Sequence, residues 1–224
     1  MTSDPKILGL AFLGGIIPSL LWLWFWLKED AKKPEPKGLL AICFIVGMIA
    51  VIFVLPVQRF IQEAFNDNQW QIVLWATSEE LIKYLAVLII IFKTNYVDEP
   101  LDWAIFLITG ALGFAAFENT LFLLKPGLLM DQVTLGLLRY LGSTLLHAVS
   151  SGIIGISLGL AFYMSGFKKK IYLIIGILVA IALHSVFNFF IMENSGSNFL
   201  SVLAFLWVVT IIIMLLFEKL RRMQ

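Results

Sequence analysis

The sequence predicts an all-α, polytopic membrane protein with about seven transmembrane helices and no sizeable extramembrane domain. Hydrophobic residues make up 60% of its 224 residues and charged residues only 14%, whereas soluble domains average roughly 45–50% and 25%. A soluble domain of this length could not bury so much apolar surface, because most of its residues would lie near its boundary. Seven apolar stretches are long enough to cross a hydrocarbon core, which requires about 20 helical residues.

The expected spans form one integral-membrane domain, 1–224, and occupy residues 7–27, 38–57, 70–92, 103–124, 133–164, 171–192 and 198–217. The first is too long for a signal peptide's apolar region and lacks a small-residue cleavage site, so we expect it to be retained. The fifth exceeds one perpendicular crossing, so its first turns should lie at the interface or tilt. Turn-forming residues occupy short connections between the spans, at 32–36, 66–68, 98–100, 125–127 and 194–196.

Charge and cysteine content exclude other classes of protein. The 16 Lys and Arg against 15 Asp and Glu give a net charge of +1, which provides no basic surface for nucleic acid. A single cysteine, Cys43, excludes an intrachain disulfide framework and a multi-cysteine zinc site. We therefore expect no nucleic-acid partner. The expected surroundings are a lipid bilayer, and the sequence does not determine the oligomeric state.

The distribution of Lys and Arg between the loops predicts the orientation. One face holds Lys6, Arg59, Lys125 and Arg139, and the other holds eleven: Lys28, Lys32, Lys33, Lys37, Lys93, Lys168, Lys169, Lys170, Lys219, Arg221 and Arg222. We therefore expect the N-terminus outside and the C-terminus in the cytoplasm, which agrees with an odd number of spans.

Polar and ionisable residues inside four spans are the main functional signal; they are Glu79, Glu80 and Lys83, then Glu118 and Asn119, then His147, and finally His184 and Asn188. A charge at mid-membrane costs about 2.5–3.5 kcal/mol or more, so these groups must face one another or a wet cavity. At 1.5 Å per residue, Glu79, Glu118 and His184 lie about 14, 9 and 12 Å from the outer side. Matching depths predict a shared site between the midplane and the outer leaflet.

Helical geometry refines this prediction. Lys83 falls about 40° from Glu79 and 60° from Glu80 around the helix, so it can pair with either carboxylate. His184 and Asn188 share a face at i,i+4. Two sets of small residues predict close helix packing; they are Gly110 with Gly113, and Gly155 with Gly159.

Four segments together resemble the signatures of the PrsW-type intramembrane protease family. They are Glu79-Glu80-Leu-Ile-Lys83, the run from Gly113 to Asn119, Arg139 followed by His147, and His184-x-x-x-Asn188. Glu35-Pro36 is similar to a further family feature, and the match covers about residues 20–190. Phe114-x-x-x-Glu118 and the last motif also resemble the wider superfamily of CAAX prenyl proteases and bacteriocin-processing enzymes. The chain departs from the family pattern at Asp102-Trp103, where Asp-Gly is common, and at Asn188, where Asp is common.

The resemblance implies a prokaryotic plasma-membrane endopeptidase that cuts membrane-tethered proteins near the outer side, as in the first (site-1) cleavage of anti-sigma factors. It implies catalytic roles for Glu79, Glu80, Glu118, His147, His184 and Asn188, supported by Lys83, Asn119 and Arg139.

Two mechanisms stay open. In a glutamic-type mechanism, Glu79 is the general base, kept ionised by Lys83, while His184 and Asn188 bind the oxyanion. In a metal-dependent mechanism, His147, His184 and Glu79 or Glu118 bind Zn²⁺, although the H-E-x-x-H spacing is absent.

Other functions fit part of the pattern. Intramembrane Glu, His and Lys also build proton-coupled transporters, but no inverted repeat accompanies them here. A retinal-binding protein needs a Schiff-base lysine in a span, and only Lys83 offers one. A non-catalytic membrane scaffold is the third alternative.

Overall fold

Seven helices make up the fold in the computed structural model, which describes residues 4–30, 32–124, 133–193 and 199–223. The side chains of 133–141, 192, 193 and 199 lie outside this description. The helices are α1 (Pro5–Glu29), α2 (Lys37–Ala64), α3 (Asn68–Ile91), α4 (Asp102–Leu123), α5 (Val133–Leu160), α6 (Gly166–Glu193) and α7 (Phe199–Arg221). The described residues contain no strand, so the predicted all-α class is confirmed.

Several helices extend beyond the apolar runs that predicted them. The second continues from residue 57 to Ala64, and the sixth begins at Gly166 rather than 171. Hydropathy marks only the part of a helix inside hydrocarbon, whereas backbone hydrogen bonding continues into the headgroup region. The fifth helix is shorter than predicted, because a turn in which Phe162 N–H donates to the Gly159 carbonyl ends it at Leu160.

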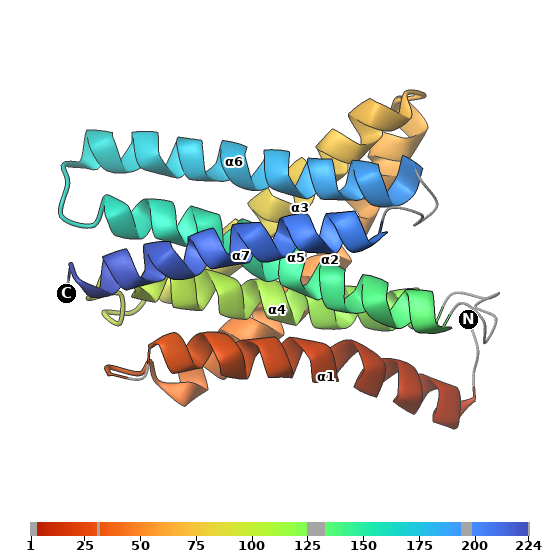
Figure 1. Cartoon of the computed structure of the whole chain (residues 1–224), viewed down its shortest axis with the longest axis horizontal. Coiled ribbons are helices and arrows are strands. Elements are labelled where there is room, and N and C mark those ends of the chain that lie inside the picture. The colour runs from red at the N-terminus through yellow and green to blue at the C-terminus, as the bar shows by residue number, and fades with distance from the viewer. Residues whose placement is uncertain (1–3, 31, 125–132, 194–198, 224) are drawn as a thin grey trace.

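Six described helices are long and apolar enough to cross a membrane, and α3 falls outside that set. Its 24 residues extend about 36 Å, which is sufficient length. Helix α3 is excluded because three charged residues, Glu79, Glu80 and Lys83, lie in its middle. The helices run alongside one another, and the two termini lie at opposite ends of the bundle (Figure 1), as an odd number of crossings requires.

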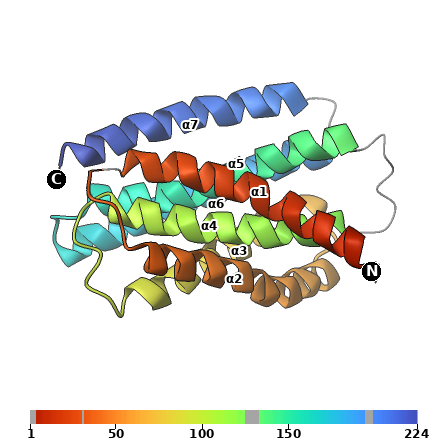
Figure 2. The same cartoon turned by 90° about the horizontal axis from the view of Figure 1, so that it is seen from below.

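Helix α4 forms the centre of the bundle and is buried along most of its length. It packs against α1, α2, α3 and α5, whereas α7 lies along one edge (Figure 2). A Cβ atom on Gly47 would overlap the carbonyl of Gly110, and one on Gly113 would overlap the carbonyl of Phe44. Backbone contact between α2 and α4 therefore requires glycine at Gly113, one turn from Phe117 and Glu118. This close approach fixes the position of α2 beside the polar residues of α4.

At the end of the bundle nearest the α1–α2 loop, a second polar cluster joins that loop to the start of α4. The Asp102 carboxylate accepts the N–H groups of Asp98 and Glu99 at 2.8 and 2.6 Å. The Glu35 carboxyl group is buried and hydrogen-bonds Asp102. Burial, followed by the nearby Asp102 charge, raises the pKa of Glu35 to about 9, and burial raises the pKa of Asp30 to about 7.

These pKa values predict that the folded protein loses stability as pH rises. A carboxyl group with a raised pKa binds its proton more tightly when folded, so between about pH 5 and pH 9 the unfolded state holds fewer protons. We expect Glu35→Gln to match the wild type near pH 5 and to be more stable at pH 9 by about 1–2 kcal/mol. Thermal unfolding in detergent across this range measures the effect. If the difference in stability between the two proteins were the same at pH 5 and at pH 9, Glu35 would not hold a proton more tightly in the folded state.

Candidate active site

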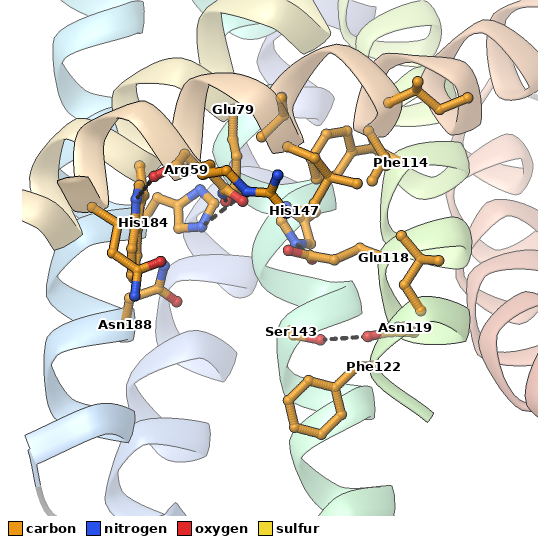
Figure 3. A pocket seen from close by; sticks show the side chains of 18 of the residues that line it. Arg59, Glu79, Phe114, Glu118, Asn119, Phe122, Ser143, His147, His184 and Asn188 are labelled. Atoms are coloured by element: carbon orange, nitrogen blue, oxygen red, sulfur yellow. Dashed lines mark hydrogen bonds and ion pairs between the residues drawn. The ribbon is translucent and has the colours of Figure 1, made fainter. Parts of the chain in front are cut away.

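A cavity of about 950 Å³ opens among α2, α3, α4, α5 and α6 and contains most of the predicted polar residues. Glu79, Glu118, Asn119, His147, His184 and Asn188 all line it. In Figure 3 their side chains converge from separate helices on one space. The prediction that four helices bring these groups to one place therefore agrees with the described geometry.

Glu79, His147 and His184 form the tightest group in this cavity. Each offers one potential ligand atom, and the three atoms lie within 4.8 Å of one another. All three residues are buried, with exposed fractions of 4%, 2% and 2%. The Oε2 atom of Glu79 lies 3.5 Å from Nε2 of His184 and has no hydrogen-bond partner among the described residues.

Glu80 hydrogen-bonds Nδ1 of His184 and does not line the cavity. Its Oε1 atom is 2.7 Å from Nδ1 of His184 and 2.6 Å from Nζ of Lys83, and its Oε2 atom accepts the Ser151 hydroxyl at 2.9 Å. A carboxylate only accepts hydrogen bonds, so Nδ1 of His184 carries a proton. With Nδ1 protonated, a neutral ring has its lone pair on Nε2, which lies toward Glu79, and such carboxylate–histidine pairs orient metal-binding imidazoles.

His147 is held by contacts at both ring nitrogens. Nζ of Lys83 lies 3.0 Å from its Nδ1, and Oε2 of Glu118 lies 2.8 Å from its Nε2. Because an ammonium group only donates, Nδ1 accepts from Lys83 and Nε2–H donates to Glu118. The ring also packs edge-to-face against His184, with centroids 5.1 Å apart. Lys83 therefore connects Glu80 to His147 across α3 and α5.

The other predicted site residues have distinct surroundings. Asn119 hydrogen-bonds Thr144 at 2.9 Å and Ser143 at 3.2 Å, which ties α4 to α5 at the cavity wall. Asn188 follows His184 by one turn and lines the same cavity. The side chain of Arg139 lies outside the described part of the structure.

The structure decides one choice that helical angle left open. Of the two carboxylates that Lys83 could reach, it pairs with Glu80, because α5 and α6 bring Ser151 and His184 to the same carboxylate. Sequence reasoning also missed Gln58 and counted Arg59 only as an orientation signal. Both line the cavity, and Arg59 reaches across it in Figure 3. Little in the sequence marks Gln58 and Arg59 as site residues, since they follow the end of an apolar run, where loop residues are expected.

Glu79 and His184 present opposed lone pairs, which a cation or a proton between them would stabilise. Two ligands of one tetrahedral zinc ion lie about 3.3 Å apart, close to the 3.5 Å observed. His147 contributes a ring nitrogen to the same group, and to bind a cation it would exchange its hydrogen bond to Lys83 or to Glu118 for the metal. Two imidazoles and one carboxylate also match the ligand types of catalytic zinc sites. The residues therefore fit a zinc-like cation.

A family model described as PrsW family intramembrane metalloprotease matches residues 35–217. The chain belongs to this family. Among curated relatives, Protease PrsW of Oceanobacillus iheyensis is 28% identical, with 88% of this chain and 91% of the relative covered. The proteins of the same name from Geobacillus kaustophilus and Bacillus subtilis are 26% and 25% identical, covering 86% of this chain and 86% and 88% of the relatives. No solved structure matches the chain significantly.

PrsW membership identifies the chain as a multi-pass intramembrane protease and confirms the resemblance seen in its motifs. The transporter and scaffold alternatives are set aside by the same finding. The family is described as metalloproteases, and the structure brings a Glu-His-His set together in this chain.

Proposed function

We propose that the chain hydrolyses peptide bonds of membrane-tethered proteins in the described cavity, with Glu79, His147 and His184 as ligands of Zn²⁺. The observation that carries this proposal is the 3.5 Å approach of the unpartnered Oε2 of Glu79 to Nε2 of His184, with His147 within reach. Burying an unpartnered carboxylate oxygen is costly, and a bound cation offsets that cost.

Zinc bound at these ligands would supply a Lewis acid and acidify a water molecule near neutral pH. Glu118 is the general base in this proposal, because its side chain is 38% exposed in the cavity beside His147. It accepts a proton from the attacking water and returns it to the leaving amine. Arg59 and Asn188 line the same cavity and donate hydrogen bonds to the carbonyl oxygen as its negative charge develops. Glu80 keeps the Nδ1 proton on His184 throughout.

The glutamic-type mechanism is the second candidate, because a proton between Glu79 and His184 would also stabilise their approach. There Glu79 is the base, Glu118 or His147 positions the water, and His184 with Asn188 binds the oxyanion. It involves no metal. The two mechanisms therefore predict opposite results when metal is removed.

The proposed orientation places the N-terminus outside and the C-terminus in the cytoplasm of a prokaryotic plasma membrane, as the Lys and Arg distribution indicates. The cavity then lies toward the outer leaflet. Substrates are membrane-tethered proteins cut near that side, and anti-sigma factors are the class that the resemblance suggests.

Metal removal tests this proposal. We expect purified protein treated with a zinc chelator to lose about 10²-fold or more of its cleavage of a membrane-tethered reporter, because the water is no longer activated. Zn²⁺ at one equivalent should restore cleavage, and Mg²⁺ should not, since it prefers all-oxygen ligands. Full activity in protein that elemental analysis finds metal-free would support the glutamic mechanism instead.

A further inference from the structure

Gln58 makes a hydrogen bond from α2 to the catalytic group of residues. Its Nε2 donates to Oε1 of Glu79 at 2.7 Å. Gln58 is half-buried and lines the cavity. Among the described residues, this is the hydrogen bond that Glu79 makes through its side chain.

The bond makes the two oxygens of Glu79 different. Oε1 is occupied by the Gln58 amide, whereas Oε2 has no described hydrogen-bond partner and faces Nε2 of His184. A neutral amide orients the carboxylate without neutralising its charge, unlike an ammonium group. Rotation about the terminal torsion of Glu79 is otherwise broad, so this donor fixes the plane of the carboxylate and leaves its second oxygen facing His184.

Gln58 is itself fixed by α3. The Trp75 indole N–H donates to the Gln58 carbonyl oxygen at 3.2 Å. Trp75 and Glu79 are four residues apart and share one face of α3, so α3 contacts both the backbone and the side chain of Gln58. Pro56 lies two residues earlier within α2 and removes one N–H from the helix ladder. The end of α2 is therefore held in register by α3 at the cavity.

We propose that Gln58 is a positioning residue that fixes the Glu79 carboxylate and directs Oε2 toward the metal and the reacting water. This inference rests on the proposed function, in which Glu79 is a ligand. Partners that orient ligands typically contribute about 10–100-fold to metal affinity or activity. The same magnitude is expected for Gln58.

The test compares Gln58→Leu and Gln58→Asn with wild type in the purified full-length chain. Leu removes the donor at similar volume, and Asn keeps an amide but is one methylene too short. We expect both to lower Zn²⁺ affinity, measured by competition with a chromophoric chelator, about 10–100-fold. We expect kcat to fall by a similar factor with KM nearly unchanged, since a misdirected carboxylate affects the reacting atoms more than substrate binding.

Gln71→Leu is the matched control. Gln71 Nε2 donates to the Phe65 carbonyl in the same α2–α3 hairpin but does not line the cavity, so metal affinity and kcat should stay within about twofold of wild type. If one Gln58 variant fails to fold, the other carries the test. Wild-type values for both Gln58 variants would overturn the positioning role while leaving the protease intact. A wild-type chain that neither binds Zn²⁺ nor cleaves would instead overturn the proposed function.

Discussion

Glu79→Gln should lower cleavage about 10²–10⁴-fold, the contribution expected of a group that acts directly in the chemistry, while the fold remains intact. The Gln side chain keeps an oxygen for the Gln58 amide but has no charge with which to bind zinc or accept a proton. Glu79 is buried, and no described Lys or Arg pairs with it. In metal-free protein, loss of its charge therefore leaves no uncompensated partner, and there we expect the melting temperature to equal or exceed that of wild type. Reporter cleavage and thermal unfolding, measured on the same preparation, check both parts.

Glu63→Gln provides the control, because Glu63 also lines the cavity but is exposed. The same loss of one carboxylate there should change cleavage less than about threefold. An active Glu79→Gln enzyme would rule out Glu79 as ligand or base. Equal losses in both variants would instead indicate a general charge effect on substrate entry.

Lys83→Met should strongly destabilise the protein, by about 3–5 kcal/mol, the cost of removing one partner of a buried ion pair. Lys83 is almost fully buried and lies 2.6 Å from Glu80 and 3.0 Å from His147. Its removal leaves the Glu80 charge without its ammonium partner and releases Nδ1 of His147. Glu80→Gln in the same chain should restore part of the stability, because the unpaired charge is then also removed. Denaturant unfolding of the single and double variants measures this coupling.

Lys33→Met is the comparison on the surface. Lys33 pairs with Asp98 at 3.1 Å and with Glu99 at 2.7 Å, but its side chain is more than half exposed. Exposed ion pairs contribute about 0–1 kcal/mol, so this variant should unfold almost like wild type. A Lys83→Met protein as stable as Lys33→Met would show that the buried pair of Lys83 with Glu80, and its contact with His147 on α5, do not stabilise the fold.

Much of the fold was predictable because hydrocarbon solvent imposes a simple rule. Only helices satisfy their own backbone groups, so each long apolar run became a helix. The charged third run was also predicted as a span, since its length and flanks outweighed Glu79, Glu80 and Lys83. The ends of α2, α5 and α6 were less predictable, because helix caps and interfacial turns leave no hydropathy signal.

The site was predictable as far as depth and helical angle allow. These placed Glu79, Glu118 and His184 at similar depths, and the structure brings them together with His147 in one cavity. The choice of Lys83 between Glu79 and Glu80 was not predictable, because it depends on Ser151 and His184 arriving from α5 and α6. Gln58 was missed for a similar reason. Its role depends on the α2–α3 packing, and nothing in its local sequence distinguishes it from a loop glutamine.

Cleavage of membrane-tethered proteins by a Glu79-dependent site is tested by comparing membrane-protein N-termini by mass spectrometry in cells that express wild type or Glu79→Gln at matched levels. We expect new N-termini just outside single-pass segments with wild type alone, which would identify the substrates and the side of cleavage together. The same new N-termini with both proteins would contradict the assignment of Glu79. New N-termini on the cytoplasmic side would contradict the proposed orientation.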